Sequence, residues 1–208
     1  SKAPGVRFSF VILSDTHNHR RCRLGQGRWL RAAVRWINRR RPDFVLGLGD
    51  LVAGGGDCMH ASARRRADVS AQLEELRDKL LMPLAVPFVP VSGNHDLGTR
   101  GSRDGRAPWR AWSRFWRQQR KHVLPAARRL AFRRSLRFEH RGVGIAVLGY
   151  YGTAQVTRAE LAWARTHLRS GDLVFRHVNP FGVSCLRAGY CGIAAAHGGD
   201  HAPTELTG

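Results

Sequence analysis

Clusters of Asp, Asn and His residues recur in the first half of the sequence, each where a short apolar run ends. A later histidine, His177, follows a fourth run, and the clusters are Asp15-Thr16-His17, Gly49-Asp50 and Gly93-Asn94-His95-Asp96. Carboxylates, imidazoles and amide carbonyls are side-chain ligands of divalent cations. Two such ions about 3.5–4 Å apart can activate water and stabilise the in-line displacement of a phosphoryl group. The residue types therefore predict a site for phosphate ester chemistry.

One cluster alone would not support this prediction. An Asp-x-His at a strand end is more often a hydrogen-bonded pair, a Gly-Asp dipeptide is common, and a single histidine usually serves structure. The argument rests on three clusters at three successive strand ends. A two-metal site also needs a carboxylate that both ions share, because it reduces their mutual repulsion, while neutral imidazoles preserve the positive charge that attracts phosphate.

The runs that lead into the clusters are typical of buried strands. Phe8–Leu13, Phe44–Leu48 and Val86–Val91 are short and rich in β-branched or aromatic residues, and the prolines of the third suit an edge strand or a strand end. Between them, Arg28–Asn38 and Val69–Leu81 have apolar residues at the three- and four-residue spacing of amphipathic helices. This alternation predicts strand–helix units with the site at the carboxyl ends of the strands.

The second half of the chain predicts further strands. Arg137–Tyr150 has the pattern of a hairpin that turns at Gly142, Thr157–Leu168 that of a helix, and Leu173–Phe175 that of a strand leading into His177. At 208 residues, we expect one domain that spans residues 1–208.

In order and spacing, the clusters resemble the signature of the calcineurin-like metallophosphoesterases: D-x-H, G-D, G-N-H-[DE], a late histidine and finally G-H-x-H. The resemblance runs from Phe8 to His177, and GNHD after an apolar strand is its most specific part. It implies an α/β fold, a four-layer α/β/β/α sandwich with the metals at one end between two sheets. It also implies hydrolysis of a phosphate mono- or diester by a metal-activated hydroxide, with two divalent ions such as Mn, Fe or Zn.

The resemblance also implies roles for individual residues. Asp15 and His17 would hold the first metal, Asp50 would bridge both metals, and the second metal would be held by Asn94 and His177.

The histidine of the third cluster has a different implied role. His95 would hydrogen-bond the phosphoryl group and protonate the leaving oxygen, an acid function that suits histidine near neutral pH. The alternative is that His95 only supports Asp50. Asp96 would orient His95, or would cap the turn that follows.

The end of the chain departs from the family pattern. In place of G-H-x-H the sequence has Ala196-His197-Gly198-Gly199-Asp200-His201, which is H-x-x-x-H. Either a loop two residues longer lets His197 and His201 complete the metal shells, or a divergent tail leaves the shells and the second sheet incomplete. The Gly- and Ala-rich composition from Gly182 onward leaves both alternatives open.

Positive charge is the main abnormality of composition. The chain has 35 Lys and Arg against 15 Asp and Glu, a net charge of +20, which attracts phosphate-rich partners or reflects an Arg-rich codon preference. Between Gly98 and Arg141, fourteen basic and two acidic residues give a net +12. We interpret about 98–141 as a basic insertion or cap over the site.

The same segment supports a rival hypothesis. A degenerate phosphoesterase could bind nucleic acid through arginines interleaved with Trp109, Trp112, Phe115 and Trp116, and a nuclease would combine binding with catalysis. The simpler interpretation is that Trp112 and Trp116, four residues apart, form the buried stripe of a helix with an arginine-rich outer face.

The cysteines, the lengths of the apolar runs and the first residues give weaker evidence about the function. Four cysteines show no C-x-x-C pair, so they do not predict a structural zinc site. No apolar run approaches the roughly 20 residues of a membrane span, and Ser1–Gly5 carries no apolar signal region. The cytoplasm is slightly favoured, while export, substrate class and oligomeric state stay open.

Overall fold

The computed structural model describes residues 8–18, 26–53, 69–97, 106–130, 135–149 and 156–177. The strands in these ranges are β1 (Phe10–Leu13), β2 (Phe44–Leu48), β3 (Phe88–Val91), β4 (Leu136–His140), β5 (Val143–Leu148) and β6 (Leu173–Arg176). The α-helices are α1 (Gln26–Arg40), α2 (Val69–Leu76), α3 (Arg106–Gln118) and α4 (Arg158–His167). A π-helical turn, Arg77–Leu81, extends α2, and two 3-10 turns, Arg120–His122 and Pro125–Ala127, follow α3.

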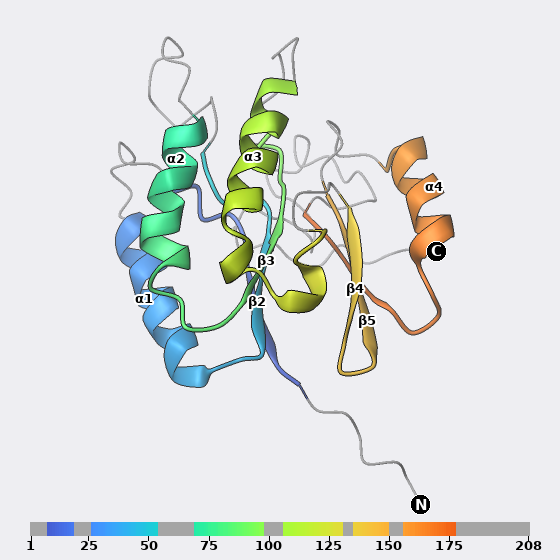
Figure 1. Ribbon diagram of the computed structural model, residues 1–208, viewed down its shortest axis with the longest axis horizontal. Helices are drawn as coiled ribbons and strands as arrows, with labels where there is room; N and C mark the ends of the chain where they lie inside the picture. The colour runs from blue at the N-terminus through green and yellow to red at the C-terminus, as the bar shows by residue number, and fades with distance from the viewer. Residues whose placement is uncertain are drawn as a thin grey trace, which may run out of the picture.

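The strands form two three-stranded sheets. The first has the order β1-β2-β3 and is parallel throughout, so β3, which contains Pro90, is an edge strand. The second has the order β4-β5-β6, with β4 antiparallel and β6 parallel to β5. Figure 1 shows both sheets with the helices on their outer sides.

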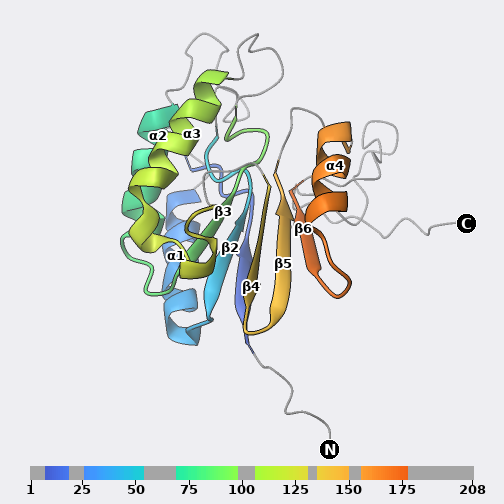
Figure 2. The same ribbon diagram turned by 45° about the vertical axis from the view of Figure 1, so that its right-hand side comes forward.

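The two sheets face each other between two layers of helices. Helices α1, α2 and α3 cover the first sheet, and α4 lies outside the second (Figure 2). Aromatic rings join the sheets, with the centroids of Phe44 and Phe138 5.9 Å apart and those of Phe10 and Phe175 5.7 Å apart. This is the α/β/β/α layering that the family resemblance implied.

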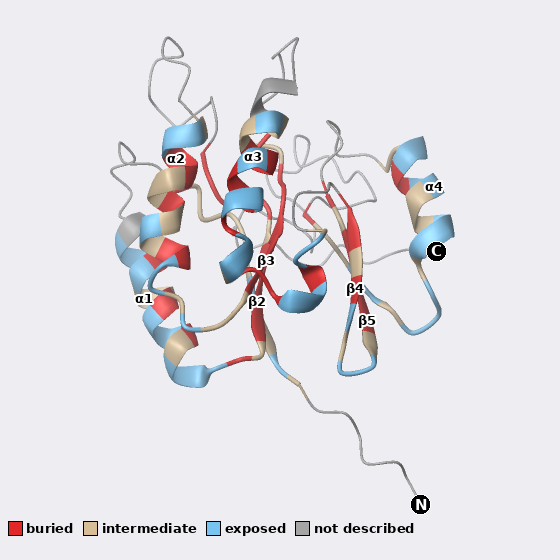
Figure 3. Cartoon of the chain, viewed as in Figure 1, coloured by how far each residue is buried: buried red, intermediate tan, exposed pale blue. Residues whose placement is uncertain are grey.

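Packing against the first sheet determines which helix faces are buried. In α1, Leu30, Val34 and Ile37 form the buried stripe, and burial of each such side chain contributes about 1.5–3 kcal/mol. Trp29 and Trp36 are also among the apolar residues of the range Arg28–Asn38, but both are exposed. In Figure 3, buried and exposed positions alternate along the helices of this layer.

Helix α3 is part of the same layer. Trp112 and Trp116 are fully buried, and the Trp116 ring stacks on Phe88 of β3 with centroids 5.6 Å apart, which confirms the buried-stripe interpretation. The described part of the segment 98–141 therefore packs into the helical layer and, through β4, into the second sheet. Residues 98–105 and 131–134 lie outside the described residues, and the role of the segment 98–141 as a cap over the site stays a prediction.

His177, the late histidine of the sequence pattern, directly follows β6 of the second sheet. The β4–β5 hairpin turns through Arg141 and Gly142, both with positive φ, as two-residue hairpins require. Helix α4 begins with a capping box in which Thr157 and Glu160 bind each other, and Glu160 also pairs with Arg176 of β6 at 2.9 Å. Glu160 is buried, and the apolar residue next to it in the helix, Leu161, is exposed.

Among the described residues, no helix has both the length and the apolar character that crossing a membrane requires.

Candidate metal centre

The segments after β1 and β2 stay paired beyond the ends of the strands. The backbone N–H of Asp15 donates to the carbonyl of Gly49 at 3.1 Å, and that of His17 donates to the carbonyl of Asp50 at 3.0 Å. Asp15, His17 and Asp50 all have positive φ, between 40° and 54°. Such left-handed backbone costs a non-glycine residue about 1–3 kcal/mol and clusters at functional sites. The loops therefore hold three predicted ligands in one strained arrangement.

The glycines of the clusters make room for the ligands. A Cβ at Gly49 would lie 2.6 Å from the His177 ring, and Gly49 also has a φ of +85°. A Cβ at Gly93 would lie 2.2 Å from Oδ1 of Asp50. The G-D and G-N-H patterns thus follow from close packing around Asp50 and His177.

Two groups of ligand atoms converge on Asp50. His17, Asp50 and His95 form one, and Asp15, Asp50 and His177 form the other, with the ligand atoms of each group within 4.8 Å of one another. Oδ2 of Asp50 lies 3.8 Å from Nε2 of His17 and 3.3 Å from Nε2 of His177. Asp50 is therefore positioned as the shared carboxylate that a two-metal site needs.

Asn94 lies beside the second group. Its Oδ1 is 3.2 Å from Nε2 of His177. Five of the predicted ligands, together with His95, are thus brought to one place from the ends of four strands.

Backbone carbonyls orient the imidazole rings of His177 and His95. Nδ1 of His177 donates to the carbonyl of Leu48 at 2.8 Å, and Nδ1 of His95 donates to the carbonyl of Ala53 at 2.9 Å. When either ring is deprotonated, the lone pair of its Nε2 faces the cluster. Histidines that bind metals are commonly oriented in this way.

Two carboxylate oxygens in the cluster lack hydrogen-bond donors. Oδ1 of Asp15 and Oδ2 of Asp50 are buried and have no hydrogen-bond partner among the described residues. A buried carboxylate oxygen without a donor is costly. A bound cation would satisfy both oxygens, so the donor set fits divalent metal ions.

The electrostatics of the cluster centre on one ion pair. Burial lowers the pKa of His177, but the carboxylate of Asp50, 3.3 Å from its Nε2, raises it more, to about 9. Burial raises the pKa of Asp50, but the neighbouring His177 lowers it by more. The pKa of Asp50 is therefore below its usual value. The carboxylate of Asp15, 3.7 Å from Nε2 of His17, is the main cause of the raised pKa of His17. The cluster therefore concentrates negative charge that attracts either protons or metal cations.

The identity of the family follows from a comparison with family models. The model for calcineurin-like phosphoesterases matches residues 8–200. The chain belongs to the calcineurin-like phosphoesterase family. The family implies divalent metal ions, and the groups around Asp50 are candidate ligands for them.

Among solved structures, a dimetal phosphatase from Danio rerio is similar to this family member. The two chains are 18% identical with a TM-score of 0.42, and the match covers 76% of this chain and 50% of that chain. The chain thus spans half the length of that structure. A comparison with curated proteins finds no match.

The closing histidines of the family pattern cannot be placed. His197 and His201 lie outside the described residues, and the family match ends at residue 200, between the two. Their role as ligands stays a prediction.

Asp96 has a clear structural role in this family member. It is fully buried, its Oδ1 accepts from Val52 N–H at 3.0 Å, and its Oδ2 accepts from Gly93 N–H at 2.8 Å. Burial and then the charge of Asp50 raise its pKa to about 7. The Ala53 carbonyl contacts the His95 ring, whereas Asp96 joins the segment after β2 to the segment after β3 through Val52 and Gly93. The sequence offered no signal for Ala53 or Leu48, because both act through their backbone.

Proposed function

We propose that the protein hydrolyses phosphate esters with two divalent metal ions that share Asp50. The observation that carries this proposal is the pair of ligand groups that meet at Asp50, with donorless oxygens on Asp15 and Asp50. When bound, such ions activate water for attack and neutralise charge on the phosphoryl oxygens. Phosphate monoesters and diesters are both candidate substrates.

The ligands divide around the shared carboxylate. Asp15 and His17 would hold one ion, and Asn94 and His177 the other, while His197 and His201 would complete the shells. The short contacts of His177 with Asp50 and Asn94, 3.3 Å and 3.2 Å, support its place in the second set.

His95 is proposed as the acid that protonates the leaving oxygen. Its backbone N–H donates to Oδ1 of Asp50 at 2.8 Å, which leaves Oδ2 of Asp50 toward the other ligands. The contact of its Nδ1 with Ala53 directs Nε2 toward the cluster, 3.9 Å from Oδ2 of Asp50. The backbone of His95 thus supports Asp50 while its ring is available for substrate, so the two roles considered for it are compatible.

A direct test uses a chromogenic aryl phosphate and the matching diaryl phosphate with manganese or zinc. We expect hydrolysis by the metal-loaded protein, and loss of hydrolysis in Asp50→Asn and after chelation. Asp43→Asn is a matched control, because Asp43 lies at the opposite end of β2 and binds Ser9 and His140. Equal rates with and without chelator, or a parent rate in Asp50→Asn, would reject the proposal.

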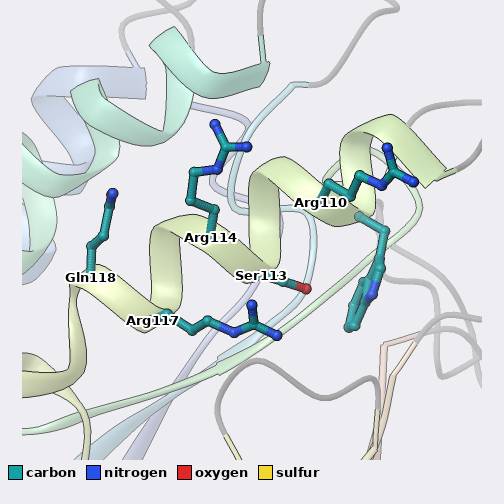
Figure 4. Close-up of a pocket in the computed structure, with 6 residues that line it drawn as sticks. Arg110, Ser113, Arg114, Arg117 and Gln118 are labelled. Carbon is teal, nitrogen blue, oxygen red and sulfur yellow. The ribbon is translucent and has the colours of Figure 1, made fainter.

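A second function, binding of phosphate-rich partners, is favoured by a hollow of about 340 Å³ on α3 (Figure 4). Its lining residues are mostly hydrogen-bond donors: Trp109, Arg110, Ser113, Arg114, Arg117 and Gln118. The sequence from 106 to 130 contains no Asp or Glu. Such a surface suits phosphate groups, either of a substrate or of a nucleic acid.

The probe for this hollow is inorganic polyphosphate, which carries phosphates without bases. Arg110→Gln with Arg114→Gln should weaken its binding and lower the dependence of affinity on salt. Arg158→Gln with Arg165→Gln on α4 is the control of equal charge. Equal effects of the two pairs would mean that the hollow contributes only to the overall charge.

A further inference from the structure

Helix α1 exposes two tryptophans to solvent. Trp29 is 66% and Trp36 44% exposed, while Leu30, Val34 and Ile37 pack into the core. Seven residues are nearly two helical turns, so both rings lie on one side of α1, about 10.5 Å apart along its axis. Since a tryptophan ring carries a large apolar surface, two such rings on one exposed face suggest a ligand that covers them.

Arginines surround both rings. The exposed arginines on α1 and directly after it are Arg28, Arg31, Arg35, Arg39, Arg40 and Arg41. The guanidinium of Arg28 lies 5.5 Å from the centroid of the Trp29 ring, and that of Arg40 lies 5.6 Å from the centroid of the Trp36 ring. No Asp or Glu occurs between residues 16 and 42. The charge of this face therefore suits a polyanion.

The aromatic part of this surface distinguishes α1 from α3. The rings of Trp112 and Trp116 on α3 are fully buried, so they cannot stack on a ligand, and α3 presents mainly cations. Helix α1 exposes both arginine side chains and tryptophan rings. The interleaved arrangement that the sequence suggested for the segment 98–141 is thus found on α1.

We propose that the α1 face, formed by Trp29, Trp36 and the six surrounding arginines, binds single-stranded nucleic acid. The rings stack on unpaired bases, and the arginines contact the phosphates between them. In a duplex, the faces of the bases are covered by their neighbours, so stacking requires a single strand.

Other occupants fit the face less well. A second copy of the chain would bring twelve arginines together without an acidic partner on either helix. An anionic bilayer would require a continuous apolar stripe to enter the interface. On α1, exposed Arg31 and Arg35 lie between the two rings in sequence.

The test measures binding of a fluorescent uridine 12-mer by anisotropy. Chelator is present throughout, so the result does not depend on hydrolysis. Trp29→Ala with Trp36→Ala should weaken binding roughly 5- to 150-fold per ring, because a base stacked on an aromatic ring contributes about 1–3 kcal/mol. The dependence of affinity on salt should stay unchanged, since no charge is removed. Trp163→Ala on α4, whose ring stacks on His167, is the control and should bind like the parent.

Replacement of the arginines tests the second half of the proposal. Arg35→Gln with Arg39→Gln should lower the slope of log affinity against log salt by about 1.4, since each phosphate contact on a single strand contributes about 0.7. Polyphosphate binding should not change when the two tryptophans are replaced.

The outcomes that overturn the proposal are equally specific. One is parent affinity of the double tryptophan variant for the 12-mer. Another is an equal loss for polyphosphate. A third is tryptophan-dependent sedimentation with vesicles of phosphatidylglycerol but no binding of the 12-mer, which would assign the face to a membrane.

Discussion

Replacement of Gly49 by alanine tests whether close packing around His177 holds the metal ligands in place. The new Cβ would lie 2.6 Å from Cγ and Nδ1 of His177 and 2.9 Å from the Cα of Gly93. These distances are below any ordinary contact, so the imidazole must move away from the Leu48 carbonyl that orients it. Gly49 also has a φ of +85°, which alanine adopts only with strain.

Gly171 provides a matched control that separates the two effects. It has a φ of +87°, and a Cβ there meets nothing within 4 Å. Both alanine variants should lose about 1–2 kcal/mol of unfolding free energy from left-handed backbone. Gly49→Ala should lose a further 1–3 kcal/mol or so from overpacking.

The assay combines urea unfolding with titration of manganese or zinc. Gly171→Ala should keep the metal affinity of the parent, and Gly49→Ala should lose at least about tenfold, because its His177 ring is displaced. The reasoning fails if the two variants have equal stability and Gly49→Ala binds metal like the parent.

Three further predictions concern the site. His95→Ala should retain metal but lose roughly 10²–10⁴-fold in the rate of hydrolysis of a substrate with a poor leaving group. The loss should be much smaller for a substrate whose leaving group needs no proton. Equal losses for the two substrates would reject the acid role of His95. Because the pKa of His177 is about 9, metal binding at pH 7 should release a proton. The apparent affinity for the metal, measured by calorimetry, should then rise about tenfold per pH unit up to pH 9. An affinity that does not change with pH would contradict this prediction. His197→Ala and His201→Ala should each weaken metal binding, and a zinc-bound crystal structure should place both rings about 2.0–2.1 Å from a metal; distant rings would show a divergent tail.

The sequence predicted the strands and most of the cluster because both leave local signals. Short apolar runs are followed by Asp15, Asp50 and Asn94, and parallel strands necessarily bring their carboxyl ends to one edge. The buried stripe of α3 was also visible, since Trp112 and Trp116 are four residues apart with arginines elsewhere.

The inner face of α1 could not be chosen from periodicity. Trp29, Ala33 and Trp36 have the same spacing as Leu30, Val34 and Ile37, and the two stripes are neighbours on the helix. Packing against the sheet and the π-helical turn decides for the second stripe, which exposes the tryptophans.

Contacts made by the backbone were also invisible in the sequence. The carbonyl of Ala53, rather than the adjacent carboxylate of Asp96, orients His95. Any residue can supply a carbonyl, so the amino-acid type gives no signal. The inward turn of Glu160 was missed because its partner Arg176 is distant in sequence.

The central claim is that two ions share the carboxylate of Asp50, and metal stoichiometry tests it most directly. The parent and Asp50→Asn are loaded with manganese or zinc, freed of unbound ions, and measured by plasma mass spectrometry, with circular dichroism to confirm folding. The account predicts two ions per chain in the parent and at most one in Asp50→Asn. A folded Asp50→Asn variant that keeps two ions, or a parent that binds no more than one, would contradict it.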